Sequence, residues 1–250
     1  MIFEEKNTFL KRVVNYNTIS SYNFSLKDFQ TTKYKPYIRE LFERNLGKID
    51  YSKDILNTNI IFLNNQIEKM ISKNKSEFIN LFNLSPQKSI GSGEILLYYL
   101  IDDFVLSGGN KPYDAESSNK EIEIKSTNLK LTTNEIFGFR IAISKETSET
   151  LNIITDLIEL AKSNNIITKT SIDISSNKIM QLRKNSNTKI KYEFIRKKYS
   201  EVISNYLNKR LFIAFNKNNG KILFLDKKIF PELINIYEVT QGNIKPSIKV

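Results

Sequence analysis

Two neighbouring stretches, "GSGEILLYYL" (91–100) and "PYDAESSNKEIEIKS" (112–126), decide how the middle of this sequence folds. The first is apolar after its opening glycines, and we expect a helix that starts at Ser92 and runs to about Leu106, ended by the glycine pair that follows. The second holds two runs of strand formers, "YDAES" and "EIEIKS", joined by the polar "SNK". The sequence therefore predicts a helix followed by a β-hairpin.

The charged side chains of the hairpin follow the two-residue period of a strand. Glu123 and Lys125 share one face with Glu121, a pattern that is also typical of a half-buried strand with a solvated polar face. Asp114 precedes the turn and would lie across from Glu123, where two facing carboxylates repel unless a cation lies between them. Glu116 is an alternative to Asp114, and Glu121 is an alternative to Glu123.

Glu94 lies one turn into the expected helix, in line with its apolar stripe. An ionised carboxylate in that position is costly unless it is paired or binds a metal. The alternative is that Glu94 only complements the positive end of the helix dipole.

The composition restricts the chemistry that these acids can perform. The 250 residues include no cysteine and no histidine, which excludes thiol nucleophiles, histidine bases and most transition-metal sites. A metal would have to be held by oxygen atoms, as Mg²⁺ or Mn²⁺ are. The net charge of +11 favours a polyanionic partner, although a lysine-rich bias from A/T-rich codons gives the same excess. No apolar run is long enough to span a membrane.

The ordered set of Glu94, Asp114 and "Glu123-Ile124-Lys125" resembles the signature of the PD-(D/E)XK nuclease superfamily, including some phage-encoded nucleases. The resemblance covers residues 89–145 and the helix expected at 147–164. It departs from the signature in one respect, because Tyr113 separates Pro112 from Asp114.

The resemblance implies a fold and a set of roles. The fold would be an α/β (α+β) restriction-endonuclease-like core, with a central mixed sheet flanked by helices. Asp114, Glu123 and the Ile124 carbonyl would bind Mg²⁺ or Mn²⁺, and Glu94 would complete the metal shell or hold a water. Lys125 would orient the attacking water or stabilise the transition state.

The rest of the chain is expected to be mainly helical. Residues 1–88 form a predicted helical N-terminal region, and 89–250 form the nuclease-like core. We expect a strand at 135–144, helices at 147–164, 171–183 and 189–208, a hairpin around the Asn-Gly turn of "RLFIAFNKNNGKILFLD", and a loosely held tail from Gln241.

DNA is the expected partner. Candidate phosphate contacts lie just after the site, around the third strand and in the basic, aromatic-rich stretch 182–199: Lys130, Arg140, Lys145, Arg183, Lys184, Arg196 and Lys197. The alternative for the basic stretch is a solvated helix face with its aromatic rings in the core.

These observations together predict a Mg²⁺-dependent DNA endonuclease of the restriction or phage DNA-processing type. It would act in the cytoplasm of a bacterium or an infected host, or in association with a virion, as a homodimer or in a larger assembly. The alternative is a non-catalytic nucleic-acid-binding or particle-associated protein on a degenerate nuclease fold.

Overall fold

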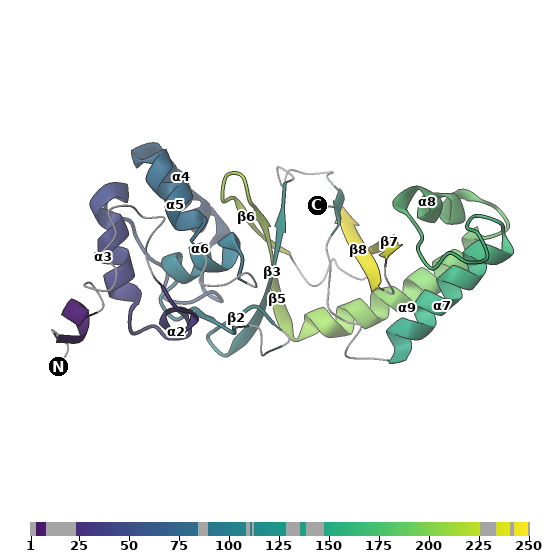
Figure 1. Cartoon of the computed structure of the whole chain (residues 1–250), viewed down its shortest axis with the longest axis horizontal. Coiled ribbons are helices and arrows are strands. Elements are labelled where there is room, and N and C mark those ends of the chain that lie inside the picture. The colour runs from purple at the N-terminus through teal and green to yellow at the C-terminus, as the bar shows by residue number, and fades with distance from the viewer. Residues whose placement is uncertain are drawn as a thin grey trace. The chain divides into compact units, whose positions relative to one another are not determined.

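A computed structural model describes residues 4–8, 24–84, 90–108, 111, 113–128, 136–138, 148–225, 234–240 and 243–249 (Figure 1). The chain divides into two compact units. Unit 1 contains residues 1–131 and 210–225, and unit 2 contains residues 132–209 and 226–250. The class is mixed α and β, as predicted. The division differs from the predicted boundary at residue 88, because the N-terminal helices belong to the same unit as the hairpin.

Unit 1 combines a group of helices with a five-stranded mixed sheet. Its helices are α2 (Leu26–Phe29), α3 (Lys35–Leu46), α4 (Ile60–Lys73), α5 (Lys75–Phe82) and α6 (Ser92–Leu100). Its strands are β1 (Val105–Leu106), β2 (Ala115–Ser117), β3 (Lys120–Thr127), β5 (Arg210–Asn216) and β6 (Ile222–Leu225). The helices α3, α5 and α6 pack on one another, and their apolar faces form one continuous core with the sheet.

The sheet of unit 1 has the order β1-β2-β3-β5-β6. The strands β1, β2 and β3 are antiparallel neighbours, β5 runs parallel to β3, and β6 returns antiparallel to β5. The predicted hairpin around the Asn-Gly turn is confirmed as β5 and β6, with Gly220 in the left-handed region at φ 76°. A parallel pair needs a long crossover, and here residues 132–209 of unit 2 lie between β3 and β5 in the chain.

The described residues of unit 2 form three helices and a second sheet. The helices are α7 (Ser148–Ser163), α8 (Ser176–Lys184) and α9 (Lys189–Asn208), and α7 packs against α9 (Figure 1). The antiparallel sheet has the order β4-β8-β7, with β4 (Ile136–Gly138), β7 (Asn235–Thr240) and β8 (Asn243–Lys249). Among the residues placed by the structure, no helix is both long and apolar enough to span a bilayer.

The helix that opens at Ser92 ends earlier than predicted. It stops at Leu100, and Ile101 is extended and forms an isolated bridge with Ser52. The side chain of Lys35 explains this end: its buried ammonium donates hydrogen bonds to the carbonyl oxygens of Ile101, Asp102 and Phe104 at 2.6–2.7 Å. These contacts fix the turn that leads into β1, so the prediction of a helix to Leu106 is wrong.

Two predictions for unit 2 need correction. The tail from Gln241 is not loosely held, because residues 243–249 form the strand β8 between β4 and β7. The strand expected at 135–144 is confirmed at β4, which belongs to the second sheet, and its other residues lie outside the described part of the chain. The helix expected from residue 171 begins at Ser176, because Ile174 is held in an antiparallel bridge with Val239.

Candidate active site

The register of the β2–β3 hairpin decides which acid meets Glu123. Glu116 pairs with Glu121, so it cannot face Glu123. Asp114 lies just before β2, and its carboxylate accepts a hydrogen bond of 2.7 Å from the backbone N–H of Ile124. Asp114, and not Glu116, is therefore the acid that contacts β3 next to Glu123.

A two-residue turn sets this register. Ser118 and Asn119 both have positive φ, at 51° and 60°, as a tight hairpin with a right-handed twist requires. Asp103 accepts hydrogen bonds of 2.7 Å from the backbone N–H and the hydroxyl of Ser118, and it also accepts one from Ser117. Asp103, which lies outside the hairpin, thus holds the turn in place.

Lys125 connects the two acids. Its ammonium forms an ion pair with Oε1 of Glu123 and lies 3.9 Å from Oδ2 of Asp114. The Glu123 side chain is only 5% exposed, and Lys125 and Asp114 are 21% and 28% exposed. A nearly buried carboxylate and a largely buried ammonium therefore share a small polar site with Asp114.

The rival acids are bound elsewhere. Glu121 forms an ion pair with Arg210 of β5 at 3.0 Å. Glu116 pairs with Lys111 at 2.5 Å and accepts a hydrogen bond from Tyr113. The structure thus brings Asp114, Glu123 and Lys125 together and leaves Glu116 and Glu121 in other contacts.

Glu94 lies in the first turn of α6, where it caps its own helix. Its carboxylate accepts a hydrogen bond from the backbone N–H of Gly91. Burial raises the pKa of Glu94 to about 8, and the charges of Asp114 and Glu123 add to this rise. Glu94 is therefore electrostatically part of the site, although its hydrogen bond is to the helix end.

The close packing of α6 on the sheet explains how Glu94 comes near. A Cβ atom at Gly93 would lie 2.9 Å from the ring of Phe215 and 3.2 Å from Cγ2 of Ile124. Only glycine allows this approach of the helix to β3 and β5. The opening glycines of "GSGEILLYYL" carry no local signal of this packing role.

The site lies on the central strand β3, at the point where its pairing with β2 ends. The helix α6 packs against the Ile124 face of β3, and Glu123 and Lys125 point to the opposite face. The register of β2 with β3 ends at Ala115 and Ile122. Just beyond it, the Asp114 carboxylate accepts the hydrogen bond of the Ile124 N–H.

The charges of the site affect one another. Burial and the neighbouring charge of Asp114 raise the pKa of Glu123, while Lys125 acts in the opposite direction. Burial disfavours the charged form of Lys125, but the three carboxylates around it outweigh burial and raise its pKa. Carboxylates that destabilise one another in this way favour an additional cation.

The available donors suit a hard divalent cation in kind. They are carboxylate oxygens, and oxygen is the ligand that Mg²⁺ and Mn²⁺ prefer. In the described part of the chain, however, no three acidic side chains are grouped closely enough to hold a metal as they lie. The hairpin acids are instead paired with the Lys125 ammonium, and Glu94 accepts the hydrogen bond of the Gly91 N–H.

The candidate DNA contacts are described only in unit 2. Lys130, Arg140 and Lys145 lie outside the described residues. Arg183, Lys184 and Lys197 are exposed on α8 and α9. Arg196 is instead held by a hydrogen bond of 2.7 Å to Glu193 and one of 3.1 Å to the carbonyl of Ile234.

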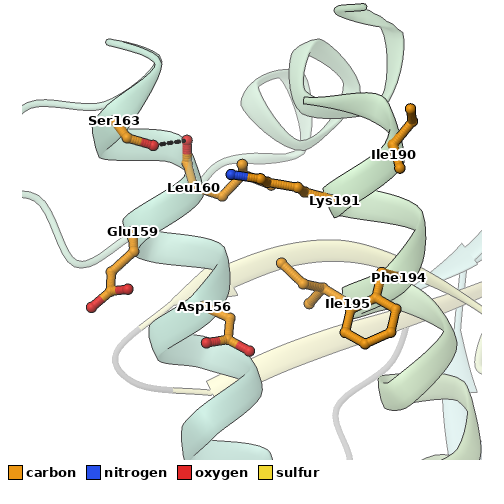
Figure 2. Close-up of a pocket in the computed structure, with 8 residues that line it drawn as sticks. All are labelled: Asp156, Glu159, Leu160, Ser163, Ile190, Lys191, Phe194 and Ile195. Carbon is orange, nitrogen blue, oxygen red and sulfur yellow. Dashed lines mark hydrogen bonds between the residues drawn. The ribbon is translucent and has the colours of Figure 1, made fainter. Parts of the chain in front are cut away.

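The aromatic rings of the basic stretch divide between core and surface. Tyr192 and Tyr199 are buried, while Phe194 is 63% exposed. Phe194 lines a groove of about 570 Å³ between α7 and α9, shown in Figure 2, whose walls are formed by Asp156, Glu159, Leu160, Ser163, Ile190, Lys191, Phe194 and Ile195. Two carboxylates on the α7 wall make this groove a poor match for a phosphate backbone.

Comparisons with protein families, with curated proteins and with solved structures found no match to this chain. The function of the chain is therefore inferred from the site itself.

Proposed function

We propose that the chain is a metal-dependent DNA endonuclease that hydrolyses phosphodiester bonds, with a PD-(D/E)XK-like site of Glu94, Asp114, Glu123 and Lys125. The observation that carries the proposal is the convergence of Asp114, Glu123 and Lys125 where the pairing of β2 with β3 ends. Three supports are independent of it: a mixed sheet, an acid-bearing helix directly before the hairpin, and a net charge of +11.

Each residue has a role that its surroundings allow. Asp114 and Glu123, with the Ile124 carbonyl, would hold Mg²⁺ or Mn²⁺. A bound divalent ion polarises the phosphoryl oxygen and lowers the pKa of the attacking water. Glu94, whose pKa burial raises to about 8, would accept a hydrogen bond from that water or join the metal shell. The Lys125 ammonium would orient the water or stabilise the charge that develops on the phosphoryl oxygens.

The proposal is tested by incubating supercoiled plasmid DNA with the protein and Mg²⁺ or Mn²⁺. We expect nicked or linear product from the wild type, and at least about 100-fold less from Lys125→Ala, because a group that stabilises transition-state charge is lost. Lys111→Ala is the matched control, since it removes a lysine–glutamate pair outside the site. Equal nicking by wild type and Lys125→Ala, or no nicking with either metal, would contradict the proposal.

A second candidate is a non-catalytic nucleic-acid-binding protein. The exposed cations of α8 and α9 favour it: Arg183, Lys184, Lys189, Lys191, Lys197 and Lys198. It predicts DNA binding whose affinity falls steeply with salt, without any cleavage. The same plasmid assay, together with binding measured at two salt concentrations, separates the two candidates.

A further inference from the structure

We propose that Lys125 is the resting counter-ion of the candidate site, and that a divalent cation enters by displacing its ammonium from Glu123 and Asp114. This inference rests on the proposed function and adds to it a competition between two cations for the same carboxylates. Lys125 would then have two successive partners: the acids before the metal binds, and the phosphate or the attacking water afterwards.

The ammonium of Lys125 lies beside both acids of the hairpin. Nζ of Lys125 is ion-paired with Oε1 of Glu123 and lies 3.9 Å from Oδ2 of Asp114. These are the carboxylates proposed to bind the metal. A divalent ion and an ammonium cannot both make close contacts with the same carboxylate oxygen, because their charges repel and their volumes overlap.

The buried Glu123 carboxylate needs a counter-ion. The Glu123 side chain is only 5% exposed, and a charge so far removed from water is costly without a partner. Lys125 meets this need while the metal is absent. A bound divalent ion would neutralise the Glu123 carboxylate equally well, and the Lys125 side chain would then be free to move.

Asp114 and Glu123 keep their positions when the Lys125 ammonium moves away. Asp114 is held by the backbone N–H of Ile124, a hydrogen bond that does not involve Lys125. Glu123 projects from the middle of β3, which β5 pairs along its length. The lysine, in contrast, has a long flexible stem and a side chain that is 21% exposed, so its head group can turn aside.

The test measures metal binding by the full chain without DNA, and therefore without cleavage. Isothermal titration calorimetry with Ca²⁺ and with Mn²⁺ would compare the wild type with Lys125→Met. We expect the variant to bind the ion about 10-fold more tightly or better, because the competing cation is gone, while its DNA cleavage is lost. Lys111→Met is the control, and its affinity should equal that of the wild type.

A second measurement uses the wild-type protein, in case Lys125→Met does not fold. Limited acetylation followed by peptide mass mapping reports how accessible each lysine is as a neutral amine. We expect Ca²⁺ to increase labelling of Lys125 several-fold, because the ammonium loses the carboxylates that protect it, and to leave Lys111 unchanged.

The outcomes separate this inference from the proposed function. Unchanged or weaker ion binding by Lys125→Met, or Lys125 labelling that does not rise with Ca²⁺, in a protein that cleaves DNA, overturns the counter-ion role alone. If the wild type binds neither ion, the inference fails together with the metal site of the proposed function. Tighter binding by the variant and metal-induced labelling of Lys125 support the inference.

Discussion

Glu94 combines two roles in one side chain, since it caps α6 through Gly91 and is coupled to the acids of the hairpin. Its sequence position allowed either a site acid or a simple helix-end acid. The structure shows the hydrogen bond to the helix end, and the charges of Asp114 and Glu123 add to the rise in the pKa of Glu94.

The raised pKa of Glu94 predicts a pH-dependent stability in the metal-free protein. The folded pKa is about 8 and the ordinary value is 4.5, so between these values the folded protein holds a proton that the unfolded chain releases. The free energy of unfolding should therefore fall as pH rises from about 5 to 8. Chemical denaturation in EDTA across this range measures it.

Glu94→Gln is the control for this pH effect. Its amide oxygen can still accept the Gly91 N–H bond, but it does not titrate. The variant should lose part of the decline seen in the wild type. Parallel stability curves for the two proteins would show that Glu94 is not the group responsible.

At the scale of elements, the close contact between α6 and the sheet depends on Gly93, which has no side chain. Gly93→Ala would place a methyl group 2.9 Å from the Phe215 ring, which belongs to the core. We expect a loss of about 1–3 kcal/mol in unfolding free energy, since overpacking of a well-packed core outweighs the better helix propensity of alanine. Denaturant unfolding measures the loss.

The matched control for this packing prediction is Ser92→Ala, the neighbouring position in the same helical turn. Ser92 is half-buried, so the change should stay within about 0.5 kcal/mol. Equal stability of Gly93→Ala and wild type would mean that α6 can shift without cost, and the close approach would then not be what positions Glu94.

At the scale of the whole molecule, unit 1 is assembled from two separate parts of the chain. The strand β5 lies between β3 and β6 in the sheet, yet it follows residues 132–209 of unit 2. Folding of the candidate site thus depends on a pairing between residues far apart in sequence, such as Glu121 with Arg210.

This discontinuity predicts that a chain ending at Leu131 does not fold cooperatively. Without β5 and β6, buried side chains of the core such as Ile122 and Ile124 lose their covering. Circular dichroism with thermal melting should show no sharp transition for the fragment and a clear one for the full chain. A cooperative melt of the fragment would contradict the proposed dependence on residues 210–225.

The sequence by itself determined the features that depend on local pattern. Local patterns located the helices expected at 147–164 and 189–208, which are α7 and α9, and turn residues located both hairpins of unit 1. The residue types of the site followed from the strand period and from the absence of histidine and cysteine. These signals are local because helix and strand periods repeat within a few residues.

Only the tertiary structure decided the features that depend on distant residues. Lys35 ends α6 at Leu100 by donating hydrogen bonds to carbonyls more than sixty positions away in the sequence. Arg210, which follows unit 2 residues 132–209 in the chain, forms an ion pair with Glu121. The choice of Asp114 over Glu116 required the hairpin register and the hydrogen bond from the Ile124 N–H to Asp114. No local period encodes such contacts, because they arise from which surfaces pack together once the chain has folded.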